Sequence, residues 1–351
     1  MSNQTEIKLT SYSHGAGCGC KISPAVLDEI LGSSENKKAF KELIVGNETK
    51  DDAAVYDLGD GNALISTTDF FTPIVDDPFL FGQIASVNAI SDIYAMGGKP
   101  IFALAILGWP ISKIPASFAK KVIEGARNIC NLINIPLAGG HSIDALEPFY
   151  GLVVNGIAPL NNIKKNSTAK IGDSIFITKK IGVGILSTAE KKGIISDEDK
   201  LISHKNMLTL NNAGEILGSL NYVSSMTDVT GFGLAGHLLE VCESSNTSAK
   251  LKQENIPLLC SLEKYINENA IPGGTNRNWS SYGNKITSIS KELQIIISDP
   301  QTSGGLLFTI PKNYEEEFLK YCERSEVKEK LPFICKIGKM VKSEDKKLIF
   351  E

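Results

Sequence analysis

Eight aspartates and no basic side chain occupy the stretch from Asp51 to Gly98. Glutamate and histidine are absent from it as well, so the stretch carries a charge of −8 while the rest of the chain carries +4. Mg²⁺ and other hard divalent cations take oxygen ligands such as carboxylates. The stretch therefore predicts a metal site formed by some of these aspartates.

Two of the aspartates, Asp52 and Asp69, flank a predicted β-hairpin. Residues 53–56 and 63–68 read as strands around an Asp60-Gly61 turn. A two-residue turn pairs residues whose numbers add to 121, which places Asp52 opposite Asp69. Like charges in that position destabilise a strand pair unless a cation lies between them, and Mg²⁺ with phosphate oxygens fits. Taken alone, the hairpin is explained equally well if Asp52 and Asp69 are exposed residues that only flank the turn.

Asp92 favours the metal interpretation. It lies on a helix expected from Pro78 to Met96, with Asn88 one turn earlier on the same face. A carboxylate among small and apolar residues is costly to bury unless it is paired or bound to a cation. Since no cation lies nearby in the sequence, Asp92 is predicted to be a third ligand of the same cluster.

A glycine-rich segment near the start, HGAGCGCK from His14 to Lys21, places Cys18 close to a lysine. Alternating glycines let a backbone approach a ligand closely, and the Lys21 ammonium is expected to lower the pKa of the thiol. The segment matches neither the dinucleotide-binding pattern nor the Walker pattern. Bound phosphates would therefore be held by metal and lysine. The alternative is a flexible leader with inert thiols.

Further turns could contact a ligand. Gly140, His141 and Ser142 follow an apolar strand and could line a nucleotide, although His141 could equally be structural. Asp228, at a predicted strand-to-helix corner, could be a helix cap, a metal ligand or both. The turn from Asp299 to Gly305 is expected to be architectural.

The elements that must position these residues alternate between short strands and amphipathic helices. Ser23 and Pro24 begin a helix that is expected to bury Val26, Leu27, Ile30 and Leu31 and to end at Gly32. A helix is also expected over residues 117–132. Strands are expected at residues 101–107, 150–157, 174–178, 222–226, 293–297 and 306–310.

The length of 351 residues predicts about two domains. A polar stretch, residues 161–170, is the best candidate for the linker between them. We expect a mobile glycine-rich leader over residues 1–22, an N-terminal domain with the metal site over 23–160 and a C-terminal α/β domain over 171–351.

Composition excludes several classes of protein. The net charge of −4 argues against a nucleic-acid binder held by bulk positive charge. The N-terminus lacks the apolar region of a secretory signal, and the apolar runs are too short to span a bilayer, so no membrane association is expected. Seven scattered cysteines do not form a disulfide framework or a zinc pattern. A cytoplasmic location is the simplest expectation.

Together these segments resemble the selenophosphate synthetase (selenide, water dikinase) family, within the aminoimidazole-ribonucleotide synthetase-like ATP enzymes. The resemblance covers nearly the whole chain, and the HGAGCGCKISP leader distinguishes the family from its wider superfamily. The other segments that carry it are GNETKDDAAVYDL, STTDFF, NAISDIYAMGGKP, ILGWP, LAGGHSID, MTDVTGFGLAGH and DPQTSGGL.

The resemblance implies a function and a fold. Family members convert selenide, ATP and water to selenophosphate, AMP and phosphate. The implied fold is α/β (α+β) with two domains, and the N-terminal domains pair into a β-barrel across a homodimer. The resemblance thus adds ATP binding and dimerisation to the N-terminal domain expected over residues 23–160. Several Mg²⁺ ions are implied as cofactors. The family also suggests K⁺ as a further cofactor, but no motif in the sequence indicates where K⁺ would bind.

The resemblance also implies residue roles. Cys18 would be the active-site nucleophile or selenium handler, and Lys21 the essential cation that contacts phosphate. Asp52, Asp92 and Asp228 match the magnesium ligands. ATP contacts are matched by Thr49, Lys50, Asp51, Asp69 and Asp92, and by Gly140, His141 and Ser142.

Two other functions stay open from the sequence. One is a different ATP-dependent kinase or synthetase of the same superfamily, which would turn over ATP without selenide and would not need Cys18. The other is a thiol-based selenium or metal carrier, which would bind its cargo without forming AMP.

Overall fold

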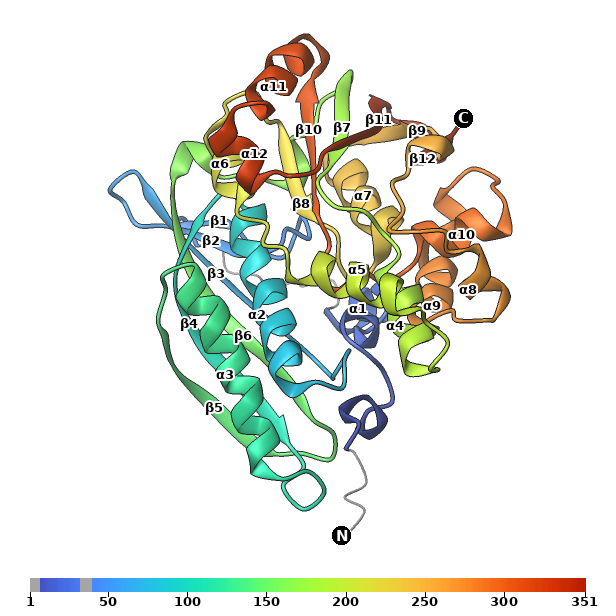
Figure 1. Ribbon diagram of the computed structural model, residues 1–351. Helices are drawn as coiled ribbons and strands as arrows, with labels where there is room; N and C mark the ends of the chain where they lie inside the picture. Colours follow the sequence, from blue (N-terminus) through green and yellow to red (C-terminus); the bar gives the residue numbers. More distant parts are fainter. Residues whose placement is uncertain (1–6, 32–39) are drawn as a thin grey trace.

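A computed structural model describes residues 7–31 and 40–351, and its strands form two six-stranded mixed sheets (Figure 1). The strands of the first sheet lie in the order β1-β2-β3-β6-β4-β5. Neighbouring strands are antiparallel except β4 and β5, which are parallel. Their bounds are β1 (Leu43–Val45), β2 (Ala54–Asp57), β3 (Asn62–Phe71), β4 (Lys99–Trp109), β5 (Leu137–Asp144) and β6 (Phe149–Pro159).

Two long helices, α2 (Pro78–Ala95) and α3 (Ala116–Leu132), cover one face of this sheet (Figure 1). Asp77 caps α2 by accepting a hydrogen bond from the backbone N–H of Leu80 at 2.7 Å, and Pro78 occupies the first turn. The two helices pack closely because Gly82 faces the α3 backbone, where an added Cβ would lie 1.9 Å from the Val122 carbonyl oxygen. Nearly all of α2 is buried, so any carboxylate on it lies inside the protein.

The second sheet has the order β12-β9-β11-β7-β10-β8, with β9 and β12 parallel and the other pairs antiparallel. Its strands are β7 (Asp173–Ile177), β8 (Ser225–Asp228), β9 (Thr247–Leu251), β10 (Leu306–Pro311), β11 (Cys335–Lys342) and β12 (Leu348–Phe350). The helices of this half are α4 (Val183–Lys191), α5 (Asp197–Leu208), α6 (Ala213–Ser219), α7 (Gly233–Ser244), α8 (Glu263–Asn267), α9 (Gly273–Tyr282), α10 (Lys291–Ile297), α11 (Glu315–Cys322) and α12 (Ser325–Lys330).

The segment between the two sheets is held to both. It contains two short 3₁₀ turns, η3 (Leu160–Asn162) and η4 (Asn166–Thr168). The buried side chain of Asn166 donates to the Lys50 carbonyl at 2.8 Å, and the Asn166 carbonyl accepts from the Ser245 hydroxyl at 2.7 Å. The expected linker is therefore an anchored connection, and the domain boundaries at 160 and 171 stay a prediction.

The described part of the leader packs onto the body of the protein. It forms 3₁₀ turns η1 (Leu9–Tyr12) and η2 (Cys18–Cys20), and Gly17 pairs with Thr72 just beyond β3. Leu9 and Cys18 are fully buried. The predicted mobility of residues 1–22 stays a prediction.

Two strand predictions differ from the structure. Residues 293–297 form helix α10, because the Ser290 hydroxyl caps its N-terminus by accepting from the Leu293 N–H and a short apolar run fits either buried element. The strand expected at 222–226 lies three residues later, as β8. The other expected strands and helices are present, with ends shifted by a few residues.

Helix α1 (Pro24–Leu31) begins where the sequence predicts, but its apolar side chains are not buried. Val26, Ile30 and Leu31 are 46%, 62% and 52% exposed, because no described element covers that face of the helix. The predicted end at Gly32 lies outside the described residues.

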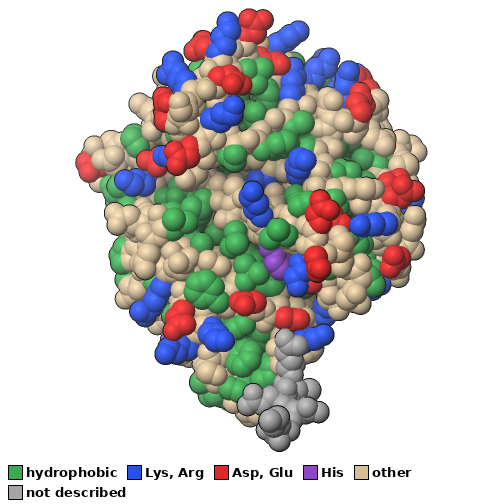
Figure 2. Space-filling model, viewed as in Figure 1, with side chains coloured by type: hydrophobic (Ala, Val, Ile, Leu, Met, Phe, Trp, Pro, Cys, Tyr) green, Lys and Arg blue, Asp and Glu red, His purple; other side chains and the backbone are tan. Residues whose placement is uncertain are grey.

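Acidic and basic side chains are interspersed on the face of the molecule in Figure 2, most densely over α11 and α12 at the top. Among the described helices, none has the length and apolar content that crossing a bilayer requires.

Candidate active site

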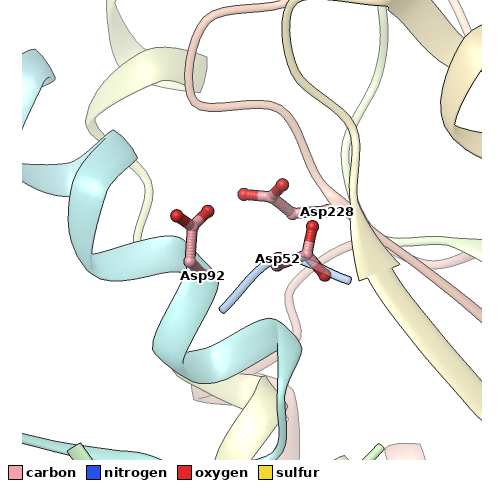
Figure 3. A group of neighbouring side chains, drawn as sticks. All are labelled: Asp52, Asp92 and Asp228. Atoms are coloured by element: carbon pink, nitrogen blue, oxygen red, sulfur yellow. The ribbon is translucent and has the colours of Figure 1, made fainter. Parts of the chain in front are cut away.

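Three carboxylates from distant parts of the chain point toward one another (Figure 3). Asp52 precedes β2, Asp92 lies on α2, and Asp228 ends β8 of the second sheet. One oxygen from each lies within 4.8 Å of the other two. The cluster therefore joins the two halves of the protein.

Each carboxylate has one oxygen held by a hydroxyl group. The Thr227 hydroxyl donates to Asp52 Oδ1 at 2.9 Å, the Thr67 hydroxyl to Asp92 Oδ2 at 2.5 Å, and the Ser91 hydroxyl to Asp228 Oδ2. Asp52 Oδ2 is buried and has no hydrogen-bond partner among the described residues. Thr67, Ser91 and Thr227 did not figure in the sequence prediction, since a lone hydroxyl residue carries little signal.

The three carboxylates repel one another inside the protein. Burial, with Asp228 and Asp92 adding repulsion, raises the pKa of Asp52 well above its ordinary value. Burial also raises the pKa of Asp92, reinforced by Asp228 and Asp69, and the pKa of Asp228 is raised for the same first reason. An unpartnered buried oxygen and three clustered carboxylates fit a divalent cation, which takes oxygen ligands.

Asp69 is not part of this cluster, which corrects the predicted Asp52–Asp69 pairing. The turn contains three residues, Gly59 to Gly61, because Leu58 N–H bonds to the Asn62 carbonyl. Ala54 consequently pairs with Ser66 and Val55 with Ile65, one residue out of the expected register. Such a shift moves side chains to the opposite face of a strand.

Asp69 instead contacts the leader. Its Oδ2 lies 3.3 Å from Lys21 Nζ and accepts from Asn88 Nδ2 at 2.5 Å. Burial by itself lowers the pKa of Lys21, but Asp69, Cys18, Asp92 and Asp228 outweigh it, so the pKa is raised. Lys21 is therefore a fixed positive charge at the edge of the aspartate cluster.

Cys18 is held by two residues from elsewhere in the chain. Its thiol donates to Asn88 Oδ1 at 3.3 Å, and its backbone N–H donates to Thr302 Oγ1 at 3.0 Å. The same Asn88 oxygen accepts from the backbone N–H of Ser303 at 2.8 Å. Thr302 and Ser303 belong to the turn that the sequence marks as architectural, so that turn also positions the thiol.

Lys21 lowers the pKa of the Cys18 thiol as expected, but it does not decide the net shift. Burial, reinforced by Asp69, raises the pKa of the thiol, and the opposing effect of Lys21 is smaller. The thiol is therefore protonated here, in accord with its role as a donor to Asn88. The sequence could not reveal this, because the effect of burial depends on what covers the turn.

Thr49, Lys50 and Asp51 form a structured loop. The Thr49 hydroxyl bonds to Asp51 Oδ2, and Asp51 Oδ1 accepts from the Asn166 backbone N–H at 2.6 Å. Lys50 has a φ of 55°. Lys50 and Asp51 line the pocket described next, whereas Thr49 lies behind it.

A pocket of about 470 Å³ opens over the cluster. Its floor carries Lys21, Asp69 and the three clustered aspartates, and its outer wall includes Leu27 and Phe232. This volume lies in the ordinary range for small-ligand sites. The lining combines charged groups with apolar side chains such as Leu27 and Phe232. With divalent cations on the carboxylates, it suits a ligand that has a polyanionic end and a flat organic end.

Gly140, His141 and Ser142 do not line this pocket. They are exposed on the edge strand β5 and line a separate hollow with Arg127. Gly140 has a packing reason to be glycine, because a Cβ there would lie 2.1 Å from the Ala105 carbonyl oxygen.

The family models that match the chain are those of AIR synthase related protein, with the N-terminal domain over residues 50–158 and the C-terminal domain over 170–351. The chain is similar in fold to thiamine monophosphate kinase from Aquifex aeolicus, with a TM-score of 0.63, 16% identity and coverage of 93% of this chain and 95% of the other.

Curated relatives are far more similar in sequence. The selenide, water dikinase of Aeromonas hydrophila is 56% identical over 90% of this chain and 91% of its own. That of Sulfurimonas denitrificans is also 56% identical, over 90% of this chain and 92% of its own. With this identity over nearly the full length, the chain belongs to the selenide, water dikinase family.

Proposed function

We propose that this protein makes selenophosphate from selenide, ATP and water, and releases AMP and phosphate. The observation that carries the proposal is the identity of 56% over 90% of the chain with a selenide, water dikinase. The site supports it, because a metal-type carboxylate cluster, a fixed lysine charge and a thiol lie around one pocket.

Asp52, Asp92 and Asp228 would hold Mg²⁺. When bound, Mg²⁺ supplies positive charge that offsets the carboxylates and the phosphates of ATP. The buried oxygen of Asp52 without a partner and the raised pKa values of the cluster support this assignment. K⁺ dependence stays a prediction without an assigned site.

Lys21 would bind the transferred phosphoryl group. Its ammonium group lies between Asp69 and the carboxylate cluster and stays protonated, so it can stabilise negative charge on phosphate oxygens without reorganisation. Asp69 orients it. The apolar wall near Leu27 and Phe232 would exclude water around the phosphates.

Cys18 would act on selenium. A sulfur atom is a soft partner for selenide, whereas a hydroxyl group is not. The Asn88 amide oxygen holds the thiol proton in this structure, and Thr302 fixes the backbone of the turn. The thiolate form would require the turn to leave its buried position or Asn88 to turn its amide group.

We also propose a homodimer that is paired through the first sheet. Strand β5 is an exposed edge strand, and the apolar side chains of Phe70, Ile143 and Ile157 on this sheet are 48%, 52% and 40% exposed. If Gly140 to Ser142 contact ATP, they would do so in the partner's pocket, because they lie outside their own. Light scattering tests the dimer, and Ile143→Asp should produce monomers with reduced turnover.

One experiment tests the activity. The protein is incubated anaerobically with Mg²⁺ and ATP, with and without selenide, and the products are followed by ³¹P NMR. A phosphorus–selenium resonance with stoichiometric AMP supports selenophosphate synthesis. ATP turnover that ignores selenide would instead indicate another kinase or synthetase, and selenium binding without AMP would indicate a carrier.

A further inference from the structure

A second pocket of about 500 Å³ lies against the leader, and we name it the leader pocket. Its walls are formed by Gly15, Cys20 and Lys21 of the leader, by one face of α4 up to its last residue, Lys191, and by the N-terminal part of α9. Lys21 lines both this pocket and the one over the aspartates. The η2 turn and Lys21, which directly follows it, therefore form a wall between the two pockets.

Cys18 lies inside this wall. Its backbone N–H donates to the hydroxyl of Thr302, and Thr302 itself lines the leader pocket. Cys20, in the same turn, is partly exposed, and its sulfur lies 2.8 Å from the Thr72 hydroxyl. A single layer of residues would thus separate a small molecule in the leader pocket from the Cys18 thiol.

The leader pocket has a cationic lining. Among the described residues that line it are His14, Lys21, Lys191 and Arg277, and there is no aspartate or glutamate. Lys191 donates to the Ser13 carbonyl at 3.2 Å and Arg277 to the Gly19 carbonyl at 2.8 Å. Neither forms an ion pair within residues 7–31 and 40–351.

The nearby carboxylates do not cancel these charges. Glu147 approaches the leader but pairs with His14 at 2.8 Å. Asp69 pairs with Lys21 on the other side of the wall. Asp299 lies beneath Gly184, and burial raises its pKa to about 8, so it is mostly protonated at pH 7. Lys191 and Arg277 therefore leave the mouth of the pocket positive.

Hydrogen selenide is a stronger acid than hydrogen sulfide and is a monoanion at neutral pH. On the aspartate side it would meet carboxylates and a bound triphosphate, both of which repel it. On the leader side it would meet cations, hydroxyl groups, a thiol and apolar side chains, and no carboxylate among the described residues of the lining. A cleft lined by charge of one sign raises the local concentration of the opposite ion.

We propose that the leader pocket is the entrance and waiting site for the hydrogen selenide anion, separate from the ATP pocket, with Lys191 and Arg277 attracting it. This inference rests on the proposed function and deepens it. It assigns the two substrates to opposite sides of the η2 turn, so that they meet only at Cys18 and Lys21.

The test removes the two charges and keeps their hydrogen bonds. In the double variant Lys191→Gln, Arg277→Gln, the amide groups can still donate to the Ser13 and Gly19 carbonyls. Lys339→Gln is the matched control, since Lys339 is exposed on β11 and lines neither pocket. Initial rates of AMP formation are measured against selenide and against ATP, at low and high salt.

The KM for selenide should rise roughly fourfold in the double variant, since each of the two exposed charges changes the local ion concentration by about twofold. The KM for ATP should stay within about twofold of the wild-type value. High salt should raise the selenide KM of the wild type and of Lys339→Gln, and should have little effect on the double variant. An unchanged selenide KM in an active double variant would overturn the inference.

A second measurement does not depend on activity. Without selenide, the alkylation of Cys20 by anionic iodoacetate and by neutral iodoacetamide is followed by peptide mass spectrometry. The ratio of the two rates should fall in the double variant and not in Lys339→Gln. An unchanged ratio would show that the pocket is not positive, and it would refute the inference whether or not the protein makes selenophosphate.

A third measurement uses phosphate, the other small anion of the reaction, as a competitor of selenide. If phosphate competes with selenide as strongly in the double variant as in the wild type, the two anions meet elsewhere and the inference fails. If the wild type makes no selenophosphate while the alkylation ratio responds as expected, the proposed function fails and the pocket remains an anion site.

Discussion

Asp52→Asn should stabilise the metal-free protein while it removes much of the response to Mg²⁺. The Asn oxygen can still accept the Thr227 hydroxyl, as Asp52 Oδ1 does at 2.9 Å. The new NH₂ group replaces a buried oxygen that has no partner among the described residues, and it can donate to Asp92 or Asp228. The substitution thus exchanges a repulsion for a hydrogen bond.

The size of the effect follows from the geometry. The ligand oxygens lie within 4.8 Å of one another, and two full charges at about 5 Å interact by about 3 kcal/mol at an effective dielectric constant of about 20. Because the raised pKa values already reduce ionisation, we expect a gain of about 1–3 kcal/mol. At about 2–4 °C per kcal/mol, the Tm should rise by about 2–12 °C.

The assay is thermal unfolding in EDTA and in a series of Mg²⁺ concentrations. Wild-type protein should gain stability with Mg²⁺, by about 2.7 kcal/mol at one hundred times the Kd, and Asp52→Asn should gain much less. The matched control is Asp60→Asn, which alters the exposed hairpin turn of the same acidic stretch. A metal-free Asp52→Asn protein that melts at or below the wild type, or one with an intact Mg²⁺ response, would refute the reasoning.

The pH dependence gives a further check with a definite sign. A carboxyl group with a raised pKa binds a proton in the folded state that the unfolded state releases, so its contribution to stability is present below pH 3.8 and is lost as the pH rises through its folded pKa. The advantage of metal-free Asp52→Asn over the wild type should therefore grow from about pH 4 upward. A constant difference would mean that the carboxylates do not repel one another.

Three other substitutions test the site. Lys21→Arg should lower turnover by about a hundredfold or more, because the planar guanidinium group of arginine cannot replace the compact ammonium charge beside Asp69. Near-normal rates in steady-state assays would show that Lys21 has no role in the reaction. Thr302→Val removes the hydroxyl that accepts the Cys18 N–H, and it should lower selenide-dependent turnover about tenfold. Thr302→Ser keeps a hydroxyl group and should turn over at nearly the wild-type rate. Equal rates for the two variants would show that Thr302 does not position the thiol. Asp299→Asn should abolish a loss of stability of about 3 kcal/mol that urea denaturation detects between pH 6 and pH 9. Burial raises the pKa of this acid to about 8, so the stability that its bound proton contributes falls as the pH rises toward that value and levels off above it.

Local pattern predicted much of the fold. Apolar periodicity, caps and glycines located α2, α3 and most strands to within a few residues. The predictions that failed concern segments whose local sequence pattern fits more than one structural environment. Residues 293–297 are an apolar run short enough to be either element, and a serine cap decided for the helix. Helix α1 is amphipathic, but amphipathicity does not supply the surface that would bury it.

The features of the site also fall into those that the sequence revealed and those that it could not reveal. The acidic stretch, the Cys18–Lys21 spacing and the family were all readable from residue types in order along the chain. The Asp52–Asp69 pairing was not, because one extra residue in a turn changes the face on which a side chain lies. The hydroxyl partners and Thr302 were missed because they are distant in sequence and common in composition.

The sequence by itself determined which chemistry to expect of this protein: carboxylates that suit a metal, a lysine that suits phosphate and a thiol that suits selenium. Only the tertiary structure decided that Asp69 lies outside the carboxylate cluster and contacts Lys21, that the thiol is protonated, and that the leader separates two pockets of opposite charge. The reason is physical. Residue types fix what a side chain can do, whereas its charge state and its partners depend on burial and on neighbours that the chain brings together only when both sheets are folded.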